Sequence, residues 1–336
     1  MQYRRIGGLE VSVVGLGGNS FGTEMFGTGA DQAETTRIVD AALDAGITLI
    51  DTAEEYSIPS FLGDNRSEEV LGVALRGRRD RVVIASKFQN HREDAPDQRG
   101  ADRIVAAVEG SLTRLGTDRV DLYQQHFPDA DTPIDEILEA LDRLVRDGKV
   151  CEVGTCNFDG PMLDAAADAA AAGGFAPYRS NQIQFSVLEP AAPEVVSTMH
   201  RLGTPALAYF PLAHGLLTGK YRRGETPPAT VRLGTDTMVS TMFRDGMMAT
   251  RPPLSDARLA TVERLTAFAE ARDHTILELA VSWLVAQPIV ASVLTGVTKA
   301  AQVEDNAAAA DWAMTPEEVA QVAAIVAAEG DGAAEG

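Results

Sequence analysis

The feature that most constrains the fold of this chain is an alternation of short apolar runs with segments of helical periodicity, which continues along nearly all of its 336 residues. Such runs predict β-strands, and the apolar stripes between them predict helices. The predicted strands cover 14–16, 47–50, 81–86, 120–125, 149–154, 179–183, 205–209 and 289–294. The first predicted helix begins at Asp31, with Glu34 three residues later, and the others cover 66–76, 102–115, 134–146, 160–172, 192–201, 256–286 with a break near Asp273, and 299–309. Eight strands that are each followed by a helix predict a (β/α)8 TIM barrel of the α/β class.

Several segments fall outside this alternation. They are a predicted N-terminal β-hairpin of residues 2–5 and 11–13, a long loop over 211–254, an extra C-terminal helix from Thr315, and a tail over 329–336 that we expect to be disordered. A loop of that length in a compact domain is usually functional, and it follows the seventh predicted strand, so we expect it to lie over the barrel mouth. The sequence therefore predicts a single barrel domain over residues 1–328.

The charge and hydropathy of the chain exclude several classes of partner. The formal net charge is −20 and the isoelectric point is near 4.6, so there is no basic footprint for nucleic acid or for an anionic membrane surface. No apolar stretch reaches the roughly 18 residues of a transmembrane helix, and no apolar run follows the N-terminal arginines as in a signal peptide. We expect a soluble cytoplasmic protein that binds neither nucleic acid nor membranes, and the sequence marks no oligomer interface.

Two cysteines, Cys151 and Cys156, are present. Five positions apart in one extended segment, they point to opposite faces and cannot form a disulfide with each other. Two cysteines without zinc-ligand spacing predict no metal site. We interpret Cys156 as a buried, inert thiol rather than a redox-active one.

Polar side chains follow three of the predicted strands. Asp51 comes directly after the second strand, Lys87 after the third and His126 after the fourth, and Tyr56 lies five residues beyond Asp51. Each of these residues alone would usually be a helix cap or a loop residue. Together they are about one strand-plus-helix unit apart, and the carboxyl ends of barrel strands converge on one mouth. The sequence therefore predicts a site at this mouth.

The segments that carry these residues are Asp51-Thr-Ala-Glu-Glu-Tyr56, Ala85-Ser-Lys87 and Gln125-His126-Phe-Pro-Asp129. They resemble the aldo-keto reductase family, and later segments match the family in order. The resemblance implies an NAD(P)H-dependent oxidoreductase that reduces aldehydes or ketones to alcohols. It implies that Tyr56 is the proton donor, that Lys87 and Asp51 tune it, and that His126 orients the carbonyl group.

The chemistry of these residue types agrees with those roles. Hydride delivery to a carbonyl carbon builds negative charge on the oxygen, where a proton donor must lie. Tyrosine has a pKa of about 10, and an adjacent ammonium lowers it, which suits Lys87. Asp51 supplies the counter-ion for a partly buried lysine. His126 can hydrogen-bond the same oxygen without ionising.

The same resemblance implies cofactor contacts. Asn157 and Gln182 would hold the nicotinamide carboxamide, Tyr209 would stack on the nicotinamide ring, and Lys220 would reach the pyrophosphate. The other implied contacts are Pro211 and Leu212 after the seventh strand, and Gly296, Thr298, Gln302, Asp305 and Asn306 at the adenosine end. Phe210 replaces a serine, and Gln302 stands where many relatives place an arginine against the 2′-phosphate. The resemblance favours NADPH, with NAD as the alternative.

Three accounts of function stay open. The first is reduction of a small-molecule carbonyl substrate with NADPH. The second is oxidation of a sugar or polyol hydroxyl with NAD or NADP, because Tyr56 can act in either direction. The third is a nucleotide-sensing partner protein similar to the potassium-channel β subunits, which share this barrel. The side chains for which we weigh two roles equally, lining an apolar pocket at the mouth or packing on the barrel itself, are Phe21, Phe26, Phe61, Phe88, Phe127 and Met242.

Overall fold

The computed structural model describes residues 1–22, 29–57, 66–90, 100–227, 231, 233–234 and 254–332, with side chains up to residue 328. Eight parallel strands close into a barrel in the order β10-β3-β4-β5-β6-β7-β8-β9. They are β3 (Val14–Gly17), β4 (Leu49–Asp51), β5 (Val83–Phe88), β6 (Val120–Gln125), β7 (Val150–Cys156), β8 (Asn181–Gln184), β9 (Ala206–Tyr209) and β10 (Val290–Gly296). The predicted (β/α)8 barrel is confirmed.

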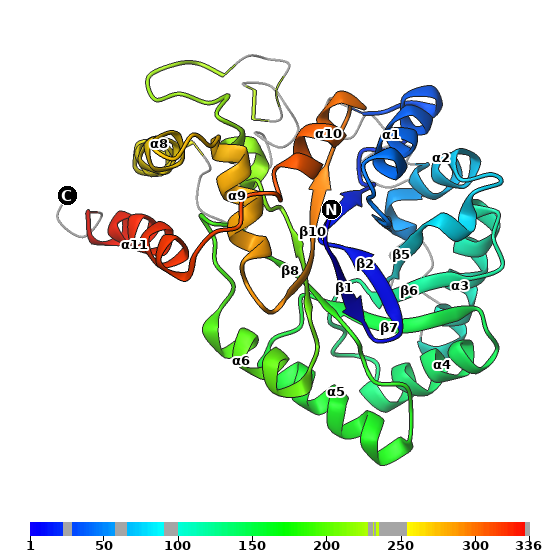
Figure 1. The fold of residues 1–336 in the computed structure, drawn as a ribbon. Coiled ribbons are helices and arrows are strands. Elements are labelled where there is room, and N and C mark those ends of the chain that lie inside the picture. The colour runs from blue at the N-terminus through cyan, green and yellow to red at the C-terminus, as the bar shows by residue number, and fades with distance from the viewer. Residues whose placement is uncertain are drawn as a thin grey trace.

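Helices surround the barrel (Figure 1). They are α1 (Gln32–Asp44), α2 (Ser67–Ala74), α3 (Gly100–Leu115), α4 (Ile134–Arg146), α5 (Gly160–Gly173), α6 (Pro193–Leu202), α8 (Asp256–Glu270), α9 (Ile276–Val285), α10 (Ala301–Ala308) and α11 (Pro316–Gly332). Short 3-10 helices add η2 (Glu54–Ser57), η3 (Arg79–Arg81) and η4 (Ala213–Thr218). The core lies between the barrel and these helices, where buried aliphatic side chains form one large cluster.

The predicted hairpin forms as β1 (Tyr3–Ile6) and β2 (Leu9–Ser12), an antiparallel pair. In Figure 1 this dark blue hairpin lies across one end of the barrel. Its buried Ile6 and Val11 belong to a second apolar cluster with strand residues such as Leu49. Because Leu49 is the first residue of β4, the hairpin closes the barrel at the amino-terminal ends of its strands and leaves the carboxyl ends for the site.

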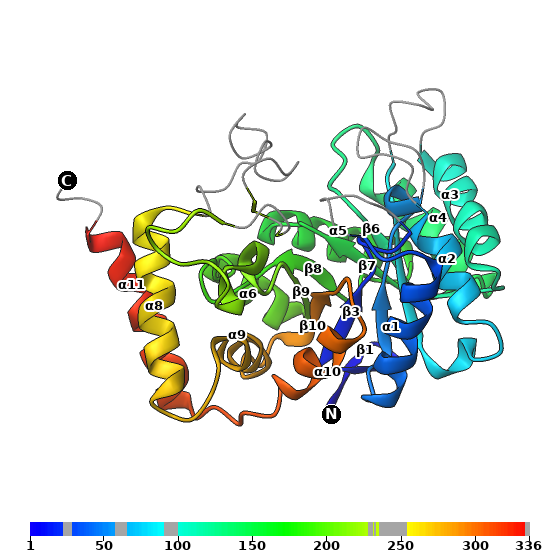
Figure 2. The same cartoon turned by 90° about the horizontal axis from the view of Figure 1, so that it is seen from above.

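The break predicted near Asp273 is confirmed in the C-terminal part. Residues 256–286 form two helices, α8 and α9, and the chain turns between them at Asp273, which has a left-handed φ of 60°. Helix α11 lies against α8 on the outside of the barrel (Figure 2) and continues to Gly332, four residues beyond the expected end of the ordered chain. Among the described residues, no helix is both long enough and apolar enough to cross a membrane.

Candidate active site

The structure brings the four predicted catalytic residues together at the carboxyl ends of β4, β5 and β6. Asp51 ends β4, Lys87 lies near the end of β5, His126 follows β6, and Tyr56 lies in η2 just beyond Asp51. Nζ of Lys87 lies 2.6 Å from Oδ2 of Asp51 and 4.9 Å from the centroid of the Tyr56 ring. The rings of Tyr56 and His126 meet edge to face with centroids 5.7 Å apart.

The Asp51–Lys87 ion pair is buried, and its polar atoms have further partners. The Lys87 side chain is fully buried, and its Nζ also donates a hydrogen bond to the carbonyl oxygen of Thr52 at 2.8 Å. Oδ1 of Asp51 accepts hydrogen bonds from Nε2 of Gln182 at 2.8 Å and of Gln124 at 3.5 Å. These donors compensate for the loss of water around the carboxylate, which a buried ion pair requires.

Two glutamines contact Asp51 in ways that the prediction did not include. We expected Gln182 at the nicotinamide carboxamide, and in the structure its side-chain amide donates a hydrogen bond to Asp51. Gln124 was not predicted as a site residue. It lies two positions before His126 in the sequence, and strand alternation places residues two apart on the same face, which is the signal that could have found it.

The surroundings set the protonation states of the three central groups. Burial alone lowers the pKa of the Lys87 ammonium, but the Asp51 carboxylate raises it, and the net pKa lies above the ordinary 10.5. Burial also raises the pKa of the Tyr56 phenol, and Lys87 offsets only part of that rise. Burial and the charge of Lys87 hold the pKa of His126 well below 6.5. At neutral pH the site therefore holds an ammonium, a protonated phenol and a neutral imidazole.

His126 has two further neighbours. Its Nδ1 lies 3.4 Å from Oε2 of Glu55, and its ring stacks on Phe127 with centroids 4.4 Å apart. Phe127 is 47% exposed, as a side chain at an open mouth would be, whereas Phe21 and Phe88 are fully buried in the core. The candidate mouth residues Phe26, Phe61 and Met242, and most of the predicted loop over 211–254, lie outside the described residues.

The residues predicted to contact the nicotinamide lie at the ends of the next strands. Asn157 follows β7 with a left-handed φ of 61° and donates from Nδ2 to the carbonyl oxygen of His126 at 3.2 Å. The hydroxyl of Tyr209, at the end of β9, donates to Oδ1 of Asn157 at 2.8 Å, and burial raises the pKa of this phenol to about 12. Asn157 therefore links Tyr209 to His126. Pro211 is buried and Leu212 partly buried just beyond.

Lys220 lies two residues beyond the end of η4 at Thr218. It is exposed, and its Nζ lies 5.4 Å from the centroid of the Tyr221 ring. The end of its side chain passes close to Gly215, whose φ of 93° is a left-handed conformation that favours glycine.

The predicted adenosine end lies at the start of α10. Oε1 of Gln302 accepts hydrogen bonds from the backbone N–H groups of Thr298 at 2.8 Å and Lys299 at 3.1 Å. Oε1 of Glu34, from α1, accepts the next one from Ala300 at 2.9 Å. Side chains of this chain therefore accept from three successive amides that could otherwise bind a phosphate. Of the remaining predicted residues, Gly296 and Asp305 are exposed and Asn306 is buried.

The two cysteines differ as the strand pattern predicts: Cys151 is exposed and Cys156 is buried. Sγ of Cys156 lies 3.9 Å from Oε1 of Gln124, and burial raises the pKa of its thiol, so it stays protonated beside the ion pair. A thiol in that state is a poor nucleophile.

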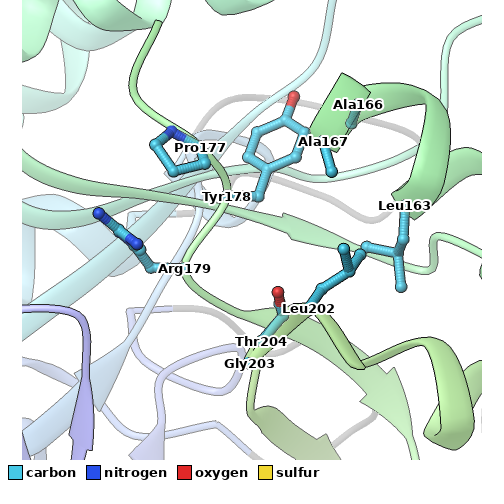
Figure 3. A pocket seen from close by; sticks show the side chains of 9 residues that line it. All are labelled: Leu163, Ala166, Ala167, Pro177, Tyr178, Arg179, Leu202, Gly203 and Thr204. Atoms are coloured by element: carbon cyan, nitrogen blue, oxygen red, sulfur yellow. The ribbon is translucent and has the colours of Figure 1, made fainter. Parts of the chain in front are cut away.

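A separate hollow of about 90 Å³ lies between α5 and α6 (Figure 3). Tyr178 and Arg179 line it just before β8 begins, and Thr204 lines it just before β9. It therefore lies at the amino-terminal ends of the strands, at the opposite end of the barrel from Tyr56. Ligand pockets are usually about 300–1,000 Å³, so this hollow is too small for a dinucleotide.

Comparisons with known proteins agree with this geometry. A model of the Aldo/keto reductase family matches residues 13–327. The chain is 33% identical to the aldo-keto reductase YhdN of Bacillus subtilis (strain 168), over 97% of this chain and 94% of that protein. It is 30% identical to a probable voltage-gated potassium channel subunit beta of Oryza sativa subsp. japonica, over 97% of each. It is also 29% identical to the L-glyceraldehyde 3-phosphate reductase of Escherichia coli O157:H7, over 96% of this chain and 91% of that protein.

Proposed function

The chain belongs to the aldo/keto reductase family, and from this premise we propose that it reduces aldehydes or ketones to alcohols with NADPH, with Tyr56 as the proton donor. The observation that carries the proposal is the buried Lys87–Asp51 ion pair next to a phenol that is protonated at neutral pH. Such a phenol has a proton to give, and the fixed ammonium favours the phenolate that remains.

The proposed division of roles follows from the charges. A bound reduced nicotinamide would supply the hydride to the carbonyl carbon. Tyr56 donates its proton to the carbonyl oxygen as negative charge develops there. Lys87 stabilises the phenolate, and Asp51 keeps Lys87 charged and in place. His126, neutral at this pH, hydrogen-bonds the same oxygen and so fixes the orientation of the substrate.

The residues that would hold the nucleotide fit most of its parts. The Tyr209 ring offers a face for stacking, and Asn157 and Gln182 carry the amides that a carboxamide can pair with. Lys220 supplies a cation for the pyrophosphate. The adenosine end would lie along Gly296 and the start of α10, where Thr298, Gln302, Asp305 and Asn306 are placed. Gln182 and Gln302 would have to exchange their present hydrogen bonds for contacts with the nucleotide.

A turnover assay tests the proposal. The purified protein is mixed with NADPH and a panel of aldehydes and ketones, and NADPH consumption is followed beside a reductase of known activity. We expect turnover with at least one class of carbonyl. The same assay on Tyr56→Phe tests the role of the phenol, and we expect its turnover to fall. Tyr3→Phe is the matched control, because Tyr3 is exposed and its hydroxyl bonds only the carbonyl oxygen of Gly46 in the described structure. Binding of NADPH without turnover on any substrate would contradict the proposal.

A second candidate function is oxidation of a sugar or polyol hydroxyl with NAD. The observation that favours it is the Glu34 carboxylate at the start of α10. Hydrogen bonds from Arg37 and Ala300 lower the pKa of Glu34, so it is charged at neutral pH. Arg37 offsets part of this charge, and the remainder would repel the 2′-phosphate that NADP carries and NAD lacks. If this candidate is correct, Glu34→Gln improves the affinity for NADPH relative to NADH. An unchanged ratio of the two dissociation constants would remove this argument.

The proposal also covers where the protein acts and how it is organised. We propose that residues 1–328 work as one domain in the cytoplasm on a small-molecule carbonyl substrate. The third account, a nucleotide-sensing partner protein, is supported only by the names of relatives such as the rice channel subunit.

A further inference from the structure

The first two residues of α2, Ser67 and Glu68, contact residues that adjoin the proposed catalytic groups. Both are fully buried. The hydroxyl of Ser67 lies 2.8 Å from that of Thr52 and donates to the carbonyl oxygen of Gly18 at 2.7 Å. Thr52 directly follows Asp51, and its carbonyl oxygen accepts a hydrogen bond from Lys87. Ser67 therefore supports the backbone that holds one side of the ion pair.

Glu68 contacts the neighbours of the other two groups. Its backbone N–H donates to the hydroxyl of Ser57 at 2.9 Å, and Ser57 directly follows Tyr56. Its carboxylate accepts from the hydroxyl of Ser86 at 2.6 Å, and Ser86 directly precedes Lys87. Glu68 is therefore bonded on one side to the turn that carries the phenol and on the other to the strand that carries the ammonium.

Helix α3 fixes this arrangement from outside. Nε of Arg114 donates to the second carboxylate oxygen of Glu68 at 2.7 Å. Eleven residues earlier on the same helix, the buried Arg103 pairs with Glu54, the first residue of η2. The short η2 is thus held at its first residue by Arg103 and at its last, Ser57, by Glu68. Buried charges paired in this way cannot move apart without leaving a charge uncompensated.

We propose that Glu68 is a positioning residue, which sets the distance and orientation between the Tyr56 phenol and the Lys87 ammonium, while Ser67 supports the backbone beside Asp51. This inference rests on the proposed function, because the distance between the two groups affects turnover only if Tyr56 is the proton donor and Lys87 stabilises its phenolate. Proton transfer and charge stabilisation depend steeply on geometry, and a displacement of about 1 Å can cost on the order of 100-fold in rate. The hydrogen bonds of Ser57 and Ser86 are the links through which Glu68 acts.

Ser57→Ala and Ser86→Ala test the proposal without leaving a buried charge unpaired. Ser282→Ala is the control, because Ser282 is also buried, in α9, and within the described part of the chain its hydroxyl makes one hydrogen bond, to the carbonyl oxygen of Ala309 at 2.7 Å. It matches Ser86 most closely, since the hydroxyl of Ser57 also donates to the carbonyl oxygen of Ala53 at 3.1 Å. We expect kcat to fall about 10-fold or more in each test variant, with KM and the nucleotide dissociation constant unchanged. The control should keep its kcat. Test variants with the kcat of the control would overturn the proposal.

The double variant adds a sharper comparison. If Ser57 and Ser86 both act through Glu68, the loss in the double variant is smaller than the product of the two single losses. Strictly multiplicative losses would show that the two serines act independently, which contradicts a shared positioning residue.

Hydrogen exchange provides a measurement that needs no turnover. In the protein without nucleotide, we expect faster amide exchange over residues 52–57 and 83–88 in both test variants, and no change there in Ser282→Ala. Unchanged exchange in these two segments would overturn the inference. A chain that fails every carbonyl assay would instead refute the proposed function, and the exchange experiment would still decide whether Glu68 joins the two segments.

Discussion

Replacing Lys87 by methionine removes one partner of a fully buried ion pair and keeps a side chain of similar length. The change leaves the Asp51 carboxylate at the barrel mouth with hydrogen bonds from Gln182 and Gln124 but with no adjacent cation. We therefore expect Lys87→Met to lower the free energy of unfolding and, in the active protein, to move the pH profile of turnover to higher pH. The second effect follows because Lys87 is the group that lowers the pKa of Tyr56.

The size of the stability loss can be bounded from the geometry. At an effective dielectric constant of about 20, unit charges separated by the observed 2.6 Å attract each other by about 6 kcal/mol. The desolvation of both groups cancels part of this attraction, and removal of one partner from a buried pair costs about 3–5 kcal/mol in general. Because two amide donors still satisfy Asp51, we place the loss near the lower limit, at about 3 kcal/mol.

Urea unfolding at neutral pH, followed by tryptophan fluorescence, measures the loss. Arg201→Met serves as the control, because Arg201 pairs with Asp164 at an exposed position where ion pairs contribute little. In the double variant Lys87→Met/Asp51→Asn neither charge of this pair remains, so we expect it to regain about 1–2 kcal/mol relative to the sum of the single losses. Losses that simply add, or a Lys87→Met variant as stable as the control, would refute this reasoning.

The pH dependence of the loss has a definite sign. The pKa of Lys87 is higher in the folded protein than its ordinary 10.5. A group with a raised pKa contributes its full stabilisation below the unfolded-state pKa and loses it as the pH rises through the folded-state pKa. The difference between the native protein and Lys87→Met should therefore be constant around neutral pH and shrink only above about pH 10.5.

Three further outcomes follow from the site. Tyr56→Phe should lower kcat by about 100-fold or more, with the nucleotide dissociation constant unchanged; full turnover in this variant would remove the phenol from the mechanism. Lys220→Ala should raise the nucleotide dissociation constant, measured by fluorescence titration, and leave kcat at saturating nucleotide intact, whereas an unaltered constant would refute a pyrophosphate contact. Thiol titration of the native protein should label Cys151 and spare Cys156, whose thiol is buried and whose pKa burial raises, and rapid labelling of both would contradict the structure.

The fold was predictable because its signals are local and periodic. Helix α4 begins and ends where the sequence places it, at Ile134 and Arg146, since Ile137, Leu141 and Leu144 form a continuous apolar stripe that the barrel buries. The ends of the strands were predicted to within one or two residues: β5 was expected to end at 86 and β7 at 154, and they end at Phe88 and Cys156. A polar residue at the end of each apolar run still indicated which side chains the carboxyl ends of the strands present. The prediction therefore brought Asp51, Tyr56, Lys87 and His126 to one mouth, as the structure does.

Contacts between distant segments were not predictable in the same way. Glu34 follows Asp31 at the spacing of a helix cap, and Asp31 does accept the backbone N–H of Glu34 at 2.8 Å. The Glu34 carboxylate, however, bonds Ala300, 266 positions further along the chain. The sequence around Glu68 likewise predicts an acidic residue in the exposed first turn of a helix. Glu68 is in fact fully buried, and Arg114 of α3 forms an ion pair with its carboxylate. A local pattern contains no information about such partners.

The central claim is that this barrel binds a nicotinamide dinucleotide beside Tyr56 and uses it on a carbonyl group. Titration of the purified protein with NADPH and, separately, with NADH, followed by nucleotide fluorescence, tests it most directly. The account predicts saturable binding with NADPH preferred, and a preference for NADH would favour the oxidation of a sugar or polyol hydroxyl instead. Binding of neither nucleotide would contradict the account.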